Sequence, residues 1–598
     1  MARDALVIGS YALLAVVFTW PAVTKSFSKI ANLDPPHTAW SLWWVKEQLL
    51  SLNNPWQTHE LLAPVGTYLA FDTISPLAGV VLAPVTAALG AGPTTNLTRF
   101  LVPALSSYVM YRLALRVGLP RWVSIVTGAL YGCSSALIWR AAYHFNLAAG
   151  AIFPPLALLA AMRFRASGRR GDAVLLGVTL GAALLVDQNF FLYSVAVVMA
   201  YAVAVAYVDG REGRRHQFRG LVVAACVALA IASPQLWMMW RQWEAGQYEQ
   251  SREVLATGWV AQGSGPTTLL APAVPFEPRT GIDLGPWAHD YGEGASSYGW
   301  GLLLLATAGA ILAFRRRMTR WLVALWLAAA LLALGPGLVL DGHRYVPLPV
   351  TVSGQELSLL LPYTYMVQLP VLADLHVPAR IGLVGMLPAA LLAGLGLQAL
   401  SARRGLWPKA MLTAAGVLTL LELGGPMVSD RTMNYDRLLA PVKADHSDSI
   451  VVDVPLIWAA GLGPYYAVGP RNPDLVVNSD SMPVLRATQH GHPIAAGGAA
   501  RLDPKVFSQL AQNRFYTDLL VLQGPTAFGT PPGPTLLRTP PPRPPRPRAG
   551  SANARALGVG WVTVWPGVSR RVLPYLRKAG FEPVAEERGA LLFKAGWD

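Results

Sequence analysis

An aspartate near the N-terminus is the first residue whose surroundings suit chemistry. Asp34 follows the first apolar stretch by a few residues and precedes two consecutive prolines, Pro35 and Pro36. Proline fixes φ and restricts the residue before it, so the backbone here is stiff. A rigidly held carboxylate can act as a general base. A turn or a helix N-cap at Asp34 explains the same residue without chemistry, and Asp72 is better explained as a cap.

Further ionisable residues stand at the ends of apolar stretches that we expect to face one side of a membrane. His144, Asp187, Glu293 and Arg380 are the four candidates. Ionisable groups at the edge of a membrane span are costly and are therefore candidates for function. We expect Glu293 to bind a hydroxyl-rich acceptor and Arg380 to hold a phosphate by paired hydrogen bonds. Each residue also has an explanation without a functional role. His144 can be an interfacial histidine, Asp187 can make a helix-terminal hydrogen bond, and Arg380 can extend to the lipid headgroups.

The sequence lacks the motifs of common soluble enzymes, since it has no Walker loop, dinucleotide fingerprint, zinc-ligand pair or nucleophile elbow. Its two cysteines, Cys133 and Cys226, both lie in apolar stretches, which excludes a disulfide framework. His490 and His492 alone make a weak metal site, and we expect a loop there. The net charge of +15 is concentrated in short loops that orient helices, so no nucleic-acid partner is expected.

The elements that must position these residues are membrane helices. The chain is 53% hydrophobic and only 14% charged, far from a soluble average. Apolar stretches of about 17 to 25 residues, near bilayer length, recur about eleven times. They are 5–25, 98–116, 121–139, 145–163, 172–186, 189–208, 220–240, 297–314, 320–338, 379–400 and 410–427. The fold class predicted is therefore a polytopic α-helical membrane protein with about 11–12 transmembrane helices.

Clusters of arginine orient these helices. The clusters near residues 163–170, 211–219, 315–320 and 403–409 should be cytoplasmic under the positive-inside rule. Alternation then places on the outer side the loops 26–73, 241–296 and 339–378 and everything after about residue 428. The stretch 74–92 is long enough to span but breaks this alternation. We interpret it as re-entrant or interfacial; the alternative is twelve spans and an outer N-terminus.

The loop 26–73 contains an amphipathic helix at 38–52. It carries Trp40, Trp43 and Trp44, which predicts a helix lying at the membrane surface.

The chain divides into a transmembrane domain, 1–427, and an extracytoplasmic α/β domain, 428–598. Short runs at 449–456, 518–523, 560–566 and 590–595 predict strands, and 506–512 and 570–580 predict helices. The proline- and arginine-rich segment 529–550 is expected to be extended or disordered.

The order of these features resembles the GT-C superfamily of integral membrane glycosyltransferases: one span, a long outer loop with an early aspartate, many further spans and an outer C-terminal domain. The segments HFNLAAGAIFPPLALLAAMRF (144–164), GEGASSYGWGLLLLATAGAI (292–311) and the apolar run 361–400 are similar to those of large bacterial GT-C-like proteins. The resemblance implies that Asp34 is the catalytic base, that Arg380 and His376 bind the donor phosphate, and that the donor is a polyprenyl-phosphate sugar. A lone aspartate stands here instead of an Asp-X-Asp pair, so a divalent metal cofactor stays undecided.

The sequence thus predicts a multi-pass plasma-membrane glycosyltransferase, inverting in mechanism, with a cell-envelope glycan, lipid or protein as acceptor. His144, Asp187 and Glu293 are its expected substrate-binding residues. A transporter or flippase of lipid-linked intermediates is the main alternative, although it predicts internal repeats that are not evident. A non-catalytic scaffold for envelope assembly is the other.

Overall fold

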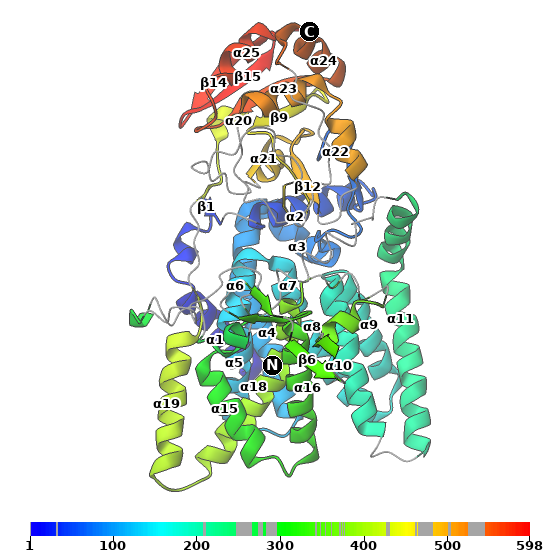
Figure 1. The fold of residues 1–598 in the computed structure, drawn as a ribbon, viewed down its shortest axis with the longest axis vertical. Helices are drawn as coiled ribbons and strands as arrows, with labels where there is room; N and C mark the ends of the chain where they lie inside the picture. Colours follow the sequence, from blue (N-terminus) through cyan, green and yellow to red (C-terminus); the bar gives the residue numbers. More distant parts are fainter. Residues whose placement is uncertain are drawn as a thin grey trace. The chain divides into compact units, whose positions relative to one another are not determined.

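The chain folds into two compact units in the computed structural model, and each is described by itself (Figure 1). The structure describes residues 2–597 except 32–33, 207–210, 247–265, 273–278, 283–295, 341–343, 347, 353–354, 360, 370–371, 373–374, 376, 426–430, 461–462, 465–481, 500–503 and 524–543. Unit 1 comprises 1–24, 97–233 and 255–427. Unit 2 comprises 25–96, 234–254 and 428–598, so the first long loop groups with the C-terminal segment.

Unit 1 is helical. Its helices are α1 (Ala2–Phe18), α4 (Ala91–Arg116), α5 (Arg121–Gly132), α6 (Ser135–Tyr143), α7 (Phe145–Gly150), α8 (Phe153–Ser167), α9 (Arg170–Leu184), α10 (Gln188–Ala206), α11 (Arg211–Glu244), α13 (Pro266–Leu270), α15 (Trp300–Leu312), α16 (Arg317–Ala333), α17 (Pro362–Met366), α18 (Ala379–Ser401) and α19 (Leu406–Glu422). The first residues of α4 and the last of α11 belong to unit 2. Two antiparallel hairpins join β4 (Leu338–Leu340) to β5 (Arg344–Val346) and β6 (Leu348–Val352) to β7 (Gln355–Leu359).

Helix α18 is the core of unit 1, because it is apolar on all sides and packs against α5, α15, α16 and α19. Glycines permit its close approach to α15. A Cβ added at Gly309 would collide with the carbonyl of Leu392, and one at Gly396 would collide with the carbonyl of Leu305. Small residues of this kind let helix backbones meet within membranes.

A second group of helices, α8 to α11, packs in the same way. Gly177 and Gly181 of α9 face α11, where a Cβ at Gly177 would meet the carbonyl oxygen of Ala224 at 2.5 Å. The core between α8, α9, α10 and α11 consists of alanine, leucine and valine.

Four helical stretches are long and apolar enough to cross a membrane: Phe145–Ser167, Gln188–Ala206, Arg215–Glu244 and Ala379–Ser401. The bent pair of α5 and α6 makes a fifth if it is one span. Several other expected spans form helices of 13 to 17 residues, such as α15 and α16. The expected span 98–116 lies in the 26-residue α4, which is not among these candidates. At 1.5 Å per residue a 17-residue helix is ~25 Å long, shorter than the ~30 Å hydrocarbon core. The described residues therefore support a helical membrane protein with four or five spans, and the larger number stays a prediction.

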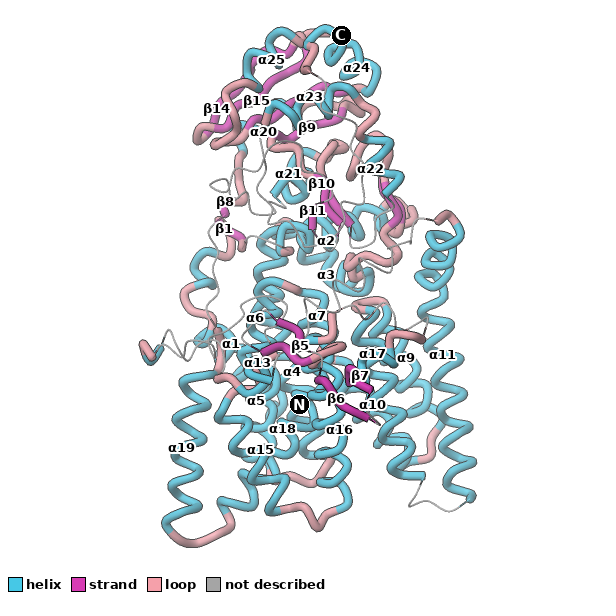
Figure 2. The backbone as a smooth tube through the Cα atoms, in the orientation of Figure 1, coloured by secondary structure: helices cyan, strands magenta, loops and turns pink. Residues whose placement is uncertain are grey.

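Unit 2 contains the sheets. Its elements are β1 (Lys29–Ile30), α2 (Pro35–Leu50), β2 (Gln57–Thr58), β3 (Thr67–Tyr68), α3 (Pro76–Leu89), β8 (Arg431–Thr432), α20 (Asp436–Lys443), β9 (Ile450–Val454), β10 (Trp458–Ala460), β11 (Gly463–Pro464), α21 (Met482–His490), β12 (Gly497–Ala499), α22 (Pro504–Leu510), α23 (Arg514–Leu522), α24 (Pro547–Leu557), β13 (Val559–Val564), α25 (Val572–Lys578), β14 (Phe581–Glu587) and β15 (Ala590–Ala595). The largest sheet has the order β14-β15-β13-β9, in which only the β13–β9 pair is parallel (Figure 2).

The core of unit 2 joins this sheet to α2. Val451, Val452 and Val562 lie in one cluster with Trp40 and Trp44, which are 0% and 6% exposed. The helix expected at 38–52 is present as α2. Trp40 and Trp44 are covered by protein, whereas Trp43 is half-buried. The expected place of this helix at the membrane surface stays a prediction.

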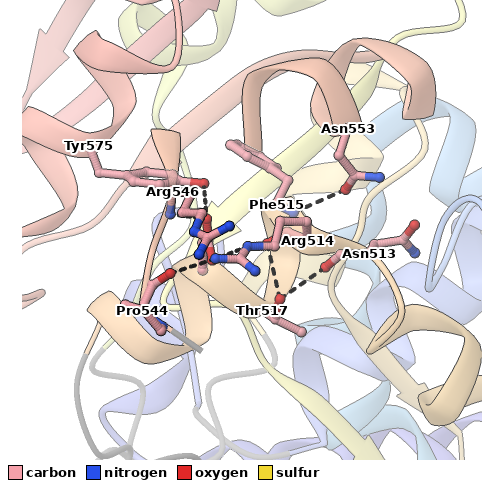
Figure 3. A network of polar contacts seen from close by, with 9 residues as sticks. Asn513, Arg514, Phe515, Thr517, Pro544, Arg546, Asn553 and Tyr575 are labelled. Atoms are coloured by element: carbon pink, nitrogen blue, oxygen red, sulfur yellow. Dashed lines mark hydrogen bonds and ion pairs between the residues drawn. The ribbon is translucent and has the colours of Figure 1, made fainter. Parts of the chain in front are cut away.

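The expected strand at 518–523 is also wrong, because these residues belong to helix α23. The buried carboxylate of Asp518, in this helix, contacts three residues of unit 2. Figure 3 shows these three, Arg514, Arg546 and Tyr575, close together. Asp518 pairs with Arg514 at 3.0 Å and accepts hydrogen bonds from the Tyr575 hydroxyl and the Arg546 backbone N–H.

Two smaller corrections concern expected loops. Residues 547–550 of the segment 529–550 begin α24, and 529–543 lie outside the described residues. Helix α21 continues to His490, so the loop expected at 487–493 begins only at Gly491.

Candidate functional site

Asp34 stands directly before α2, at its N-cap position. Pro35 and Pro36 fill the first two helical positions, where backbone N–H groups have no partner within the helix, and so favour a helix start here. The carboxylate of Asp34 makes no capping hydrogen bond and is exposed. The capping role considered from the sequence is therefore not the one it fills.

His37 and Asp72 lie beside Asp34 and complete what we call the Asp34 cluster. The Nε2 atom of His37 lies 3.3 Å from Oδ2 of Asp72, which is 7% exposed. The other oxygen of Asp72 accepts the Thr73 backbone N–H at 2.7 Å. Burial opposes the charged form of His37, but Asp72 and then Asp34 outweigh it and raise the pKa of His37 above its usual value.

The Asp34 cluster therefore combines an exposed carboxylate with a buried ion pair. His37 is charged whenever it is protonated, and the charges of Asp72 and Asp34 favour that protonated form. An ionised, solvent-accessible aspartate can accept a proton from a hydroxyl group.

A second group of polar residues lies in unit 1, around Asp187. Its Oδ1 accepts the backbone N–H of Phe190 at 2.9 Å, which caps α10, as the structural explanation from the sequence expected. Its Oδ2 accepts a hydrogen bond from Asn146 at 2.7 Å. The charge of Arg380, at the start of α18, acts on the same carboxylate. The structure thus brings two predicted residues, Asp187 and Arg380, together.

His144 lies between α6 and α7 and contacts a buried arginine. The Arg140 guanidinium lies 3.0 Å from Nδ1 of His144. Because a guanidinium only donates, His144 accepts at Nδ1 and carries its proton at Nε2. Arg140 also lies over the Trp139 ring at 4.9 Å and is 0% exposed.

Sequence reasoning missed Arg140, His37 and Arg99, a residue of α4 that is 2% exposed. A signal existed for both arginines, because each interrupts a largely apolar stretch. No signal marked His37, whose partner lies far along the chain. Buried guanidinium groups can hold a phosphate once it displaces their present contacts.

Two predicted residues, Glu293 and His376, lie outside the described residues. Within the described part of the chain, no group of three or more His, Cys, Asp or Glu side chains is placed to hold a metal ion. His490 and His492 serve the local fold: His490 accepts the backbone N–H of His492, whose ring contacts the carbonyls of Ser449 and Val442.

Comparison with solved structures places the fold. The structure is similar to that of the arabinofuranosyltransferase AftD from Mycobacteria, with a TM-score of 0.58 and 13% identity, over 100% of this chain and 40% of that chain. It is also similar to the oligosaccharyltransferase AglB from Archaeoglobus fulgidus, with a TM-score of 0.50 and 11% identity, over 100% of this chain and 74% of that chain. This chain thus spans less than half the length of AftD.

Comparison by sequence identifies one family and no curated relative. No curated protein matches the chain. Residues 31–359 match the family described as "Domain of unknown function (DUF6311)". Since this match covers more than half of the chain, the protein belongs to that family, and its fold is similar to those of AftD and AglB.

Proposed function

We propose that this protein is a membrane glycosyltransferase that moves a sugar from a polyprenyl-phosphate donor to a cell-envelope glycan, lipid or protein on the outer face of the plasma membrane. The observation that carries the proposal is the Asp34 cluster, an exposed carboxylate beside a buried His37–Asp72 pair, in a chain with the GT-C fold. Both proteins with similar structures are glycosyltransferases by name, and the AglB structure is a complex that includes a dolichol-phosphate.

In the proposed reaction, Asp34 takes the proton of an acceptor hydroxyl as its oxygen attacks the anomeric carbon of the donor sugar. The bond from that carbon to the phosphate oxygen breaks, and the lipid phosphate leaves with the bonding electrons. Attack from the face opposite the leaving group inverts the anomeric centre. His37 lies beside Asp34, whose charge contributes to the raised pKa of His37.

Arg380 is proposed to bind the donor phosphate, with His376 beside it in sequence. A guanidinium forms paired hydrogen bonds with phosphate and stabilises the charge that develops as the phosphate leaves. Asp187 and Asn146 orient this region, since Asp187 is fixed by hydrogen bonds from two segments. We propose His144, Asp187 and Glu293 as residues that contact substrate.

The test is sugar transfer by the purified protein in nanodiscs, supplied with radiolabelled polyprenyl-phosphate sugars and membrane extracts as acceptors. We expect Asp34→Asn, which keeps the shape of the side chain but cannot take the proton, to slow transfer by ~10²- to 10⁴-fold. Asp436→Asn is the matched control, because Asp436 is another exposed aspartate at the start of a helix in unit 2.

Retention of more than about a tenth of the rate by Asp34→Asn would exclude Asp34 as the base. If the wild-type protein transfers no sugar from any of several donors, the enzyme proposal fails. The flippase alternative would then be tested by movement of a labelled lipid-linked sugar across proteoliposomes.

A further inference from the structure

Unit 2 contains a cavity of about 250 Å³ to which neither Asp34 nor Arg380 contributes. Three separate segments line it: the hairpin of β2 and β3, the residue that follows α11, and helix α22. The volume is just below the ~300 Å³ at which pockets for drug-sized ligands begin. It therefore suits a single small polar unit and not a lipid chain.

The hairpin wall of this cavity is held firmly in place. The backbone N–H groups of Leu62 and Ala63 donate to the carbonyls of Ala496 and Ile494, at 3.2 and 3.0 Å. The hydroxyl of Tyr516 donates to the carbonyl of Ala63 at 2.9 Å. A wall tied to the core in this way loses little entropy when a ligand binds.

A glycine shapes the same wall. Gly66 has a φ of +75°, a conformation that other residues rarely adopt. A Cβ added there would meet the carbonyl oxygen of Thr58 at 2.5 Å and Nδ1 of His59 at 2.7 Å. Only glycine therefore lets the chain return so closely past His59, which lines the cavity.

The lining has the chemistry of a sugar site. Gln57 and Gln509 each present an amide that both donates and accepts hydrogen bonds, as vicinal hydroxyl groups require. Gln57 and Gln509 are both exposed, so a ligand can bind to them without breaking a buried contact. Tyr68 is half-buried and adds an aromatic surface against which the C–H face of a sugar ring can pack.

The charges of the lining point to an anionic substituent. His59 and Lys505 both line the cavity, and the described residues of the lining include no carboxylate. A lysine ammonium group binds carboxylate or phosphate as a point charge.

We propose that this cavity binds one saccharide unit that carries an anionic group, either the carboxylate of a uronic acid or a phosphate ester. The inference deepens the proposed function, on which it rests: the cavity would hold part of an acidic envelope glycan that serves as acceptor. It assigns a role in acceptor choice to residues of unit 2 other than those proposed for chemistry.

The test measures binding with no donor present, so that it is independent of transfer. The full-length protein in nanodiscs is titrated with glucuronic acid, glucose 1-phosphate and glucose, and binding is followed by saturation-transfer NMR. We expect both acidic sugars to bind at least about fivefold more tightly than glucose. The double variant Gln57→Ala/Lys505→Ala should lose this binding, and Lys443→Ala, at an exposed lysine of α20, should keep it.

Each outcome decides the proposal. Equal binding of all three sugars, or none of any, overturns it. Binding of inorganic phosphate as tight as that of glucose 1-phosphate, with none of glucuronic acid, would reduce the cavity to an anion site. Binding by a protein that transfers no sugar would refute the proposed function and leave this inference standing. Sugar transfer by a protein that binds no acidic sugar would support the proposed function and overturn this inference.

Discussion

Glu60, next to the cavity residue His59, should make the stability of unit 2 depend on pH. One of its carboxylate oxygens is buried and has no hydrogen-bond partner among the described residues. Burial raises the pKa of Glu60 from 4.5 to about 7, against the lowering effect of His492 and with a smaller raising effect from Asp448. The folded state therefore favours the protonated carboxyl. Its contribution to stability is complete below pH 4.5 and is lost as the pH rises through 7.

The magnitude follows from the shift in pKa. A change from 4.5 to about 7 corresponds to at most ~3 kcal/mol, and to ~2 kcal/mol once the partial exposure of the side chain is counted. For a unit of this size, ~2 kcal/mol changes the melting temperature by about 4 to 8 °C.

The assay is thermal unfolding of wild type and Glu60→Gln in one detergent between pH 4.5 and 8, followed by tryptophan fluorescence. Other groups titrate equally in both proteins, so the difference between the two melting temperatures isolates Glu60. We expect wild type to lose about 4 to 8 °C relative to Glu60→Gln across this range. Parallel curves, within about 1 °C at every pH, would refute a buried carboxyl at this position.

Three further substitutions test other contacts. His37→Gln should destabilise the protein by ~1–3 kcal/mol below pH 6.5 and by less at higher pH, because the raised pKa of His37 means that its stabilising charge is lost as the pH rises; melting curves at several pH values measure this. Asp518→Ala should cost ~3–5 kcal/mol by leaving Arg514 without its buried carboxylate partner, and the same melting assay checks it against Asp436→Ala. Gly309→Val should prevent α15 from meeting α18, which size-exclusion chromatography would show as aggregated protein, whereas Gly416→Val, at a glycine with open space around it, should elute normally.

Much of the fold follows from local sequence pattern, and the exceptions have physical causes. The strands β9, β13 and β15 were predictable because each is a short run of β-branched or bulky apolar residues. The run 518–523 has the same composition but forms a helix, since a short apolar run does not distinguish strand from helix by periodicity. In the folded protein the helix makes tertiary contacts that the local pattern does not reveal: Asp518 of α23 accepts hydrogen bonds from the Arg546 backbone N–H and the Tyr575 hydroxyl.

The tryptophans of α2 illustrate a related limit. A row of tryptophans beside polar residues fits a membrane surface and a protein core equally well. Only the residues that pack against it separate the two, and for Trp40 and Trp44 those residues come from the C-terminal sheet. The sequence therefore predicts an amphipathic helix but not what covers its apolar face.

The candidate site also contains residues that the local sequence marks and contacts that only the fold creates. Asp34 was predictable because the two prolines beside it mark a stiff backbone, and Arg380 because it begins an apolar helix. His37 and Asp72 are separated by more than thirty residues, so their pairing at 3.3 Å exists only in the fold. Yet that pair separates the roles of the two aspartates. Asp72 is buried and already bonded to His37 and Thr73, so it cannot reach an acceptor hydroxyl without breaking those contacts. Asp34 is exposed and makes no capping hydrogen bond, so of the two aspartates it is the one that we propose as the base.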